Sequence, residues 1–260
     1  MRAAVFGMLL ALAASPAVAQ DAGDGWDLIV DESQNMTLAV VGYSSGQTLA
    51  VRCRDGDLEL LLSGLPPLET LTRYVEAAYS DGRVEAGLWF TSGEGSLVFS
   101  PAPHLDARRL RQGGPLQLSV AILPDPEAPL RRYALDLPSD SANLDHVLAD
   151  CGASRPDARD DLVRWSIPRG EGVVFWTRQP TPHYPQAAIS VRSGLVVLSC
   201  VTVGDGRLDS CRVEREAQHR RYGFGESALK SMRDARVAPA AEGGPPAGRL
   251  LITTIRFQIA

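Results

Sequence analysis

The feature of this 260-residue chain that most constrains its fold is a β-hairpin near the carboxyl end. The segment from Gly194 to Val203 is rich in β-forming residues, and Leu208 to Glu214 has the composition of its partner strand. Between them, Asp205-Gly206 is typical of a two-residue type I′ turn. This turn fixes which residues face each other across the hairpin.

The register of the hairpin predicts a disulfide between Cys200 and Cys211. With Asp205-Gly206 at the centre of the turn these cysteines are direct cross-strand neighbours, whose Cα atoms lie about 4.5–5.5 Å apart, a distance that a disulfide can span. The other two cysteines, Cys53 and Cys151, are then predicted to pair with each other. Alternation along the strands predicts one buried face, made by Val196, Leu198, Cys200, Cys211 and Val213, with Arg212 and Glu214 pointing outward.

Helical and strand patterns flank the hairpin. A short helix is predicted in the proline-punctuated segment from Pro182 to Ala188. Gly225 to Arg236 carries one apolar stripe and is predicted to be a helix that covers the buried face of the hairpin. The segment from Leu250 to Ile259 alternates apolar and polar residues and predicts a last, half-buried strand.

The preceding part of the chain predicts a different organisation. Residues 20–152 read as a mostly antiparallel β domain that ends in a helix from Ala142 to Cys151, and residues 153–179 read as a polar linker. Arg108, Arg109 and Arg111 are expected on a solvated helix face. The strands of this domain are predicted at Thr48–Cys53, Leu58–Leu62, Arg83–Phe90, Ser96–Phe99, Leu116–Ile122 and Tyr133–Leu137.

The amino terminus indicates export. Residues 1–19 combine Arg2, an apolar run and a small-residue cleavage motif ending at Ala19, which is the pattern of a secretory signal peptide. We therefore expect a periplasmic protein, in which the four cysteines are oxidised. The net charge of -5 gives no electrostatic reason to expect nucleic acid or anionic lipid as a partner.

Residues 180–260 resemble the carboxy-terminal domain family of TonB, the energy transducer of the Gram-negative cell envelope. The resemblance lies in the order helix, hairpin, helix, strand and in a set of spaced residues: Tyr184-Pro185, Gly194, Asp205-Gly206, Ala228-Leu229, Arg236 and Pro239. The predicted fold class is thus α+β, with an amino-terminal mostly antiparallel β domain and a small TonB-like domain. No family resemblance is found for the amino-terminal domain.

The resemblance implies a mode of binding. Such domains take up an extended peptide, the TonB box of an outer-membrane transporter, as a strand added beside their last strand. Here that edge belongs to Leu250, Ile252, Thr254, Arg256 and Gln258. A sheet edge of this kind is also compatible with a homodimer.

The resemblance leaves two functional alternatives within the family. An energy transducer needs a membrane anchor and a long spacer, and neither is evident, so we expect a soluble periplasmic binding protein for an envelope partner. The alternative is a membrane-anchored transducer of outer-membrane transport that retains residues 1–19 as its anchor.

A hypothesis from another class is an exported hydrolase. Gly42-Tyr43-Ser44-Ser45-Gly46 matches the G-x-S-x-G pattern, with Ser44 as the nucleophile, but that motif needs a helix after it and a strand is predicted instead. We therefore expect a non-enzymatic protein without catalytic residues. The scattered histidines predict no metal site, and no cofactor is expected.

Overall fold

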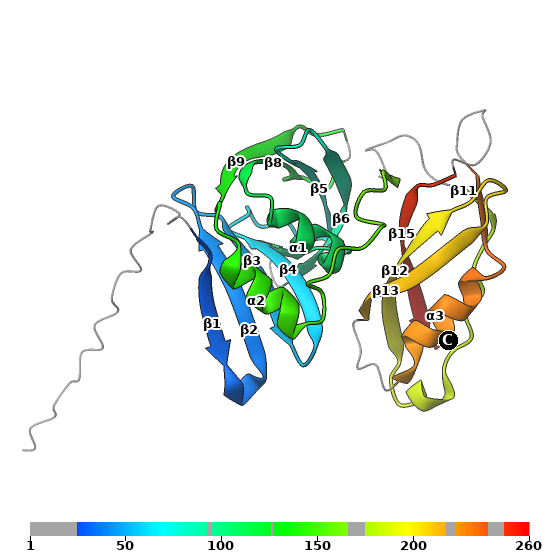
Figure 1. The fold of residues 1–260 in the computed structure, drawn as a ribbon. Coiled ribbons are helices and arrows are strands. Elements are labelled where there is room, and N and C mark those ends of the chain that lie inside the picture. The colour runs from blue at the N-terminus through cyan, green and yellow to red at the C-terminus, as the bar shows by residue number, and fades with distance from the viewer. Residues whose placement is uncertain are drawn as a thin grey trace, which may run out of the picture.

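The fold is mostly antiparallel β. It is seen in a computed structural model that describes residues 25–92, 95–125, 127–165, 175–216, 222–238 and 247–259. Within these residues the chain forms a large curved sheet, a smaller sheet and three α-helices (Figure 1). The predicted α+β class is confirmed, whereas the predicted signal peptide, residues 1–19, lies outside the described residues.

The large sheet contains nine strands in the described part of the chain, in the order β1-β2-β3-β4-β7-β6-β5-β8-β9. A parallel bridge between Gly25 and Asp140 brings the start of the described chain beside the end of β9, so the sheet curls back on itself. The strands are β1 (Asp27–Asp31), β2 (Met36–Gly42), β3 (Thr48–Arg54), β4 (Asp57–Ser63), β5 (Thr72–Ala78), β6 (Val84–Ser92), β7 (Leu97–Phe99), β8 (Gly114–Ala121) and β9 (Leu130–Leu137), with the 3-10 turn η1 (Glu32–Gln34) after β1.

The concave face of this sheet encloses the main hydrophobic core. Alternate residues of β3 and β4, such as Val51 and Leu60, are buried there. Helix α2 (Ala142–Asp150), which the sequence predicted, contributes Leu144 and Val147, both fully buried. Along each strand, every second side chain points into this core and the others point outward. This is the alternation expected of an antiparallel sheet with one buried face.

The large sheet also contains elements that the sequence did not predict. Strands β1, β2 and β5 were missed. Helix α1 (Pro103–Leu110), for which the sequence predicted only a solvated face at its arginines, packs against β4 and also reaches β13. Leu105 and Leu110 of this helix are buried. α1 therefore lies between the two sheets and is not a solvated surface helix.

The small sheet has the order β10-β15-β12-β13 among the described strands. Helix α3 (Phe224–Met232) covers one of its faces, as predicted (Figure 1). A Cβ atom at Gly194 would lie 2.7 Å from the ring of the buried Phe224, so this position requires glycine. The strands are β10 (Arg164–Trp165), β12 (Ser193–Thr202), β13 (Leu208–Glu216) and β15 (Leu250–Gln258); the 3-10 turn η2 (Gln186–Ala188) precedes β12, and β11 (Phe175–Arg178) pairs separately with β14 (Arg236–Ala238).

The hairpin and both disulfides agree with the sequence prediction. Leu198 pairs with Val213 across β12 and β13, and Cys200 is bonded to Cys211 with a Cα–Cα distance of 4.1 Å. The register slips by one residue beyond this bond, where Ser210 adopts a left-handed φ of 49°. The Cys53–Cys151 disulfide joins β3 to the end of α2, with a Cα–Cα distance of 5.6 Å.

No helix among the described residues is long and apolar enough to cross a membrane.

Candidate functional site

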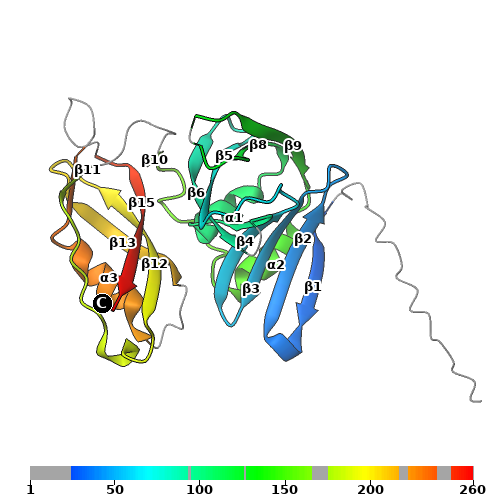
Figure 2. The ribbon, with the colours of Figure 1, turned by 180° about the vertical axis from the view of Figure 1, so that it is seen from behind.

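Strand β15 has two different edges. Along one edge it pairs antiparallel with β12, with Thr253 opposite Leu198. Figures 1 and 2 both show that the other edge faces the large sheet, on the side where β6 runs. This outer edge is the one for which the sequence predicts peptide binding.

The direction of the backbone groups of β15 can be read from its ends. Ile259 N–H donates to the carbonyl of Arg192, on the β12 side, whereas Leu250 N–H donates to the carbonyl of Val163, on the outer side. Backbone groups alternate between the two edges of a strand, so every second residue from Leu250 shares its direction. The backbone groups of Ile252, Thr254, Arg256 and Gln258 therefore point outward.

Part of this edge is already occupied by the protein's own chain. β10 runs parallel to β15, with Arg164 opposite Leu250 and Trp165 opposite Leu251. The prediction that the open edge begins at Leu250 is therefore wrong. Among the described strands, none pairs with the outer edge of β15 after Leu251, so the candidate edge runs from Ile252 to Gln258.

The side chains of β15 divide between two environments. Leu251, Ile255 and Phe257 are buried against the face covered by α3. On the opposite face Leu250 is fully buried, while Thr254, Arg256 and Gln258 are exposed. The half of the strand beyond β10 is thus accessible to a partner.

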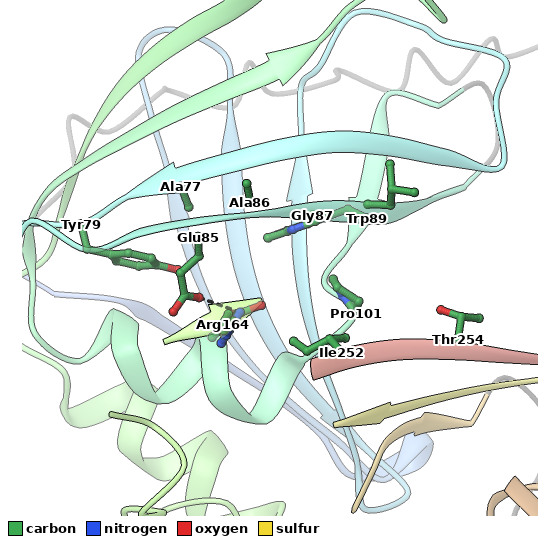
Figure 3. Close-up of a pocket in the computed structure, with 12 residues that line it drawn as sticks. Ala77, Tyr79, Glu85, Ala86, Gly87, Trp89, Pro101, Arg164, Ile252 and Thr254 are labelled. Atoms are coloured by element: carbon green, nitrogen blue, oxygen red, sulfur yellow. Dashed lines mark ion pairs between the residues drawn. The ribbon is translucent and has the colours of Figure 1, made fainter. Parts of the chain in front are cut away.

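A small pocket adjoins this edge. It has a volume of about 90 Å³ and lies between β6 and the first part of β15, with Ile252 and Thr254 on one side and Gly87 and Trp89 on the other (Figure 3). The large sheet therefore contributes residues to the surroundings of the predicted binding edge, a contribution that the sequence did not predict.

The segment after Gly152, predicted as part of a linker, is held between the two sheets. Arg108 of α1 donates two hydrogen bonds to the carboxylate of Asp160, at 2.7 and 2.6 Å. Arg109 donates to the main-chain carbonyl of Asp160 at 2.6 Å, and Arg111 donates to that of Ser154 at 2.8 Å. We call residues 153–165 the strap, because they attach β15 to α1.

These contacts overturn the expectation that the three arginines of α1 lie on a solvated face. The side chain of Arg109 is 5 % exposed and forms an ion pair with the buried Glu85. Arg164, in the strap, pairs with the same Glu85 at 2.6 Å and with Asp106 of α1. Burial lowers the pKa of Arg109, and the positive charge of Arg164 adds to that effect.

A second buried ionic cluster centres on Glu214 of β13. The sequence predicted that this side chain points to solvent, but it is 2 % exposed because α1 and the strap cover that face of the sheet. Ser199 of β12 donates a hydrogen bond to it, Arg159 of the strap lies 3.5 Å away, and His104 of α1 lies 3.6 Å away. Burial opposes ionisation of Glu214, but hydrogen bonds from His104 and Ser199 and the charge of Arg159 outweigh it, so its pKa lies below the ordinary value.

The hydrolase motif lies in a different context from that of a nucleophile elbow. Ser44 is in the turn between β2 and β3, which is closed by hydrogen bonds from Tyr43 N to Gln47 O and from Gly46 N to Tyr43 O. A strand follows the motif where the elbow requires a helix. Ser44 thus lies in a hairpin turn, and the strand that follows is the one that the sequence predicted.

In the described part of the chain, no three His, Cys, Asp or Glu side chains are placed to hold a metal ion.

Comparison with known proteins gives limited similarity to solved structures. No protein-family model matches the chain, and no curated protein does. Part of the chain is similar to a solved structure. This is the solution NMR structure of the Pseudomonas aeruginosa TonB CTD, which matches 33% of this chain and 86% of its own, with 24% sequence identity and a TM-score of 0.28. A similarity this low does not show what this protein binds.

Proposed function

We propose that this protein is a periplasmic binding protein that takes up an extended peptide of an envelope partner as a strand added to the outer edge of β15. The observation that carries the proposal is the outward direction of the backbone groups of Ile252, Thr254, Arg256 and Gln258, next to the point where β10 ends. The same edge already pairs with a strand of the protein itself, the two-residue strand β10.

The energetics indicate that backbone pairing alone does not suffice. Each backbone hydrogen bond contributes about 1 kcal/mol net, and association costs roughly 4–15 kcal/mol. A partner that pairs with the few outward residues of β15 therefore needs side-chain contacts as well. The exposed Thr254 and Arg256 and the apolar Leu88, which is 44% exposed on the neighbouring β6, are available for them.

Periplasmic placement rests on two further observations. The chain contains two disulfides, which persist in oxidising compartments. The export pattern of residues 1–19 points to the same compartment, and a mature protein that starts at Gln20 would exclude the anchored transducer.

A proline substitution tests strand addition. Thr254→Pro removes one outward N–H, whereas the backbone bonds to β12 come from the neighbouring residues, so the fold is expected to survive. Loss of one backbone hydrogen bond, about 0.5–1.5 kcal/mol, weakens binding by about two- to twelvefold, and the proline ring adds a steric obstacle. The probe is a set of synthetic peptides chosen from a displayed library of random seven-residue sequences by selection on the full-length protein.

Two matched variants complete the test. Thr254→Val keeps the N–H and is expected to bind the same peptides within about threefold. Thr253→Pro removes a bond to β12 and is expected to lower the melting temperature, which confirms the direction of the backbone groups. Binding that is equal in wild type and in a well-folded Thr254→Pro variant would contradict strand addition at this edge.

A further inference from the structure

The pocket beside β15 is formed largely by the large sheet, which lies outside the TonB-like part of the chain. Figure 3 shows Gly87 and Trp89 of β6 on one side of the pocket and Ile252 and Thr254 of β15 on the other. Ala77 of β5 and Pro101 also belong to the apolar part of the lining. The pocket is therefore shared between the two sheets, next to the first free residues of the β15 edge.

Gly87 creates room in this pocket. Alternation along β6 places Gly87 on the same face as Glu85 and Trp89, whose side chains are both buried. A Cβ atom at Gly87 would meet nothing within 4 Å, and its φ is not in the left-handed region. Backbone conformation therefore does not require glycine here, and the missing side chain leaves space in the pocket.

The polar end of the pocket is balanced in charge. Its charged lining residues are Glu85, Asp106 and Arg164, and Arg164 forms an ion pair with each of the two carboxylates. Arg109, which does not line the pocket, forms a second ion pair with Glu85. The two acidic and two basic groups sum to zero. Burial raises the pKa of Tyr79, which also lines the pocket, so its hydroxyl stays protonated. A charged side chain brought into this pocket would find no unpaired counter-ion and would lose its hydration.

The volume of the pocket sets an upper limit on size. A cavity of about 150 Å³ holds a benzene ring, so a pocket of about 90 Å³ is too small for an aromatic side chain and suits a branched aliphatic one. On a strand added to β15, the residue beside Thr254 directs its side chain to the same face as Thr254. That face is the one on which the pocket opens.

We infer that this pocket, opened by Gly87, determines which peptides the β15 edge accepts, by taking one uncharged, valine-sized side chain from the residue that pairs beside Thr254. The inference rests on the proposed strand addition and states which peptide side chain the edge selects. The amino-terminal part of the chain thus selects the partner, while the carboxy-terminal sheet supplies the backbone pairing.

The test repeats the selection of random seven-residue peptides on wild type and on Gly87→Leu. The leucine side chain fills the pocket without backbone strain. In wild type, valine, isoleucine, threonine or alanine is expected at one fixed position, and phenylalanine, lysine and glutamate are excluded from it. Gly87→Leu is expected to bind the selected valine peptide about tenfold or more weakly, and to bind its glycine version at that position about as well as wild type does.

Gly42→Leu is the matched control, since Gly42 is also a strand glycine without left-handed φ or neighbours within 4 Å and does not line the pocket. Its peptide preferences are expected to equal those of wild type. If Gly87→Leu keeps the wild-type preference while Thr254→Pro loses binding, the pocket is not the selector and strand addition stands. If both variants bind like wild type, or if wild type selects no peptide, both proposals are overturned.

Discussion

At the scale of single residues, Glu214 is buried although the alternation of its strand predicts that it is exposed. It belongs to a hairpin strand with an apparent solvent face, yet α1 and the strap cover that face and surround its carboxylate with His104, Ser199 and Arg159. A buried carboxylate is stable only when it is paired, and these groups belong to three separate elements. Glu214 therefore joins the small sheet to α1 and the strap.

This arrangement predicts a dependence of stability on pH. Folding lowers the pKa of Glu214 below its ordinary value of 4.5, so the ionised group stabilises the folded state above that pH, and this stabilisation is lost as the pH falls through the lower folded value. Asp157, whose pKa is also lowered, acts in the same direction. We expect the melting temperature to decrease between pH about 5 and pH about 3.

Glu214→Gln isolates the contribution of this residue. The variant is expected to melt at a lower temperature than wild type at pH about 7, because the neutral amide lacks the negative charge that pairs with Arg159. It is also expected to lose less on acidification. Thermal unfolding followed by circular dichroism at several pH values measures both effects, and parallel curves for the two proteins would show that Glu214 does not contribute.

At the scale of elements, the disulfides are predicted to contribute unequally. Cys53 and Cys151 are 98 residues apart, whereas Cys200 and Cys211 are 11 apart. Loop entropy gives about 4.7 kcal/mol for a loop of about a hundred residues and about 3 kcal/mol for a short one. Replacing the first pair by serine should lower the free energy of unfolding more than replacing the second, as measured by urea denaturation. The reverse order would show that local packing at the hairpin dominates.

The elements of the carboxy-terminal part could be predicted because their signals are local. The turn at Asp205-Gly206 fixes the hairpin, and alternation from Leu250 to Ile259 fixes the last strand. β5 was missed because its inward residues include Arg73, which is 1% exposed and donates a hydrogen bond to Pro66 O at 2.6 Å. An arginine among the inward positions breaks the apolar alternation on which strand prediction depends.

The candidate edge was predicted only in part, for a different reason. The alternation from Leu250 to Ile259 predicts the strand, but the residues with outward backbone groups follow from its register against β12. The pairing of Arg164 with Leu250 joins segments far apart in the chain, and a two-residue strand carries no periodic signal. The same holds for Gly87, whose role depends on the placement of β6 beside β15.

At the scale of the whole molecule, the strap determines how the small sheet is attached. Asp160 accepts two hydrogen bonds from Arg108, and its neighbour Asp161 pairs only with Arg83 and has a side chain that is 85% exposed. Asp160→Ala leaves the nearly buried Arg108 without its partner and should cost about 1–3 kcal/mol of unfolding free energy. Asp161→Ala should cost less than about 0.5 kcal/mol.

The two aspartate variants can be compared by limited proteolysis as well as by urea denaturation. If the strap attaches the sheets, Asp160→Ala is expected to be cleaved within residues 153–165 faster than Asp161→Ala. Equal cleavage rates and equal stabilities would show that the strap is held by other contacts, such as those of Arg159 and Arg164.

The burial of β12 on both faces has a consequence for work with fragments. Val197 and Ser199 are fully buried although α3 covers only the opposite face, and Leu250 packs against Leu105 of α1 and the preceding Ala102. A fragment of residues 180–260 would expose this second face to water and is expected to be poorly soluble or to self-associate. A usable fragment would need polar replacements at Val197 and Leu250, and peptides selected on it would report the β15 edge without the pocket that adjoins it.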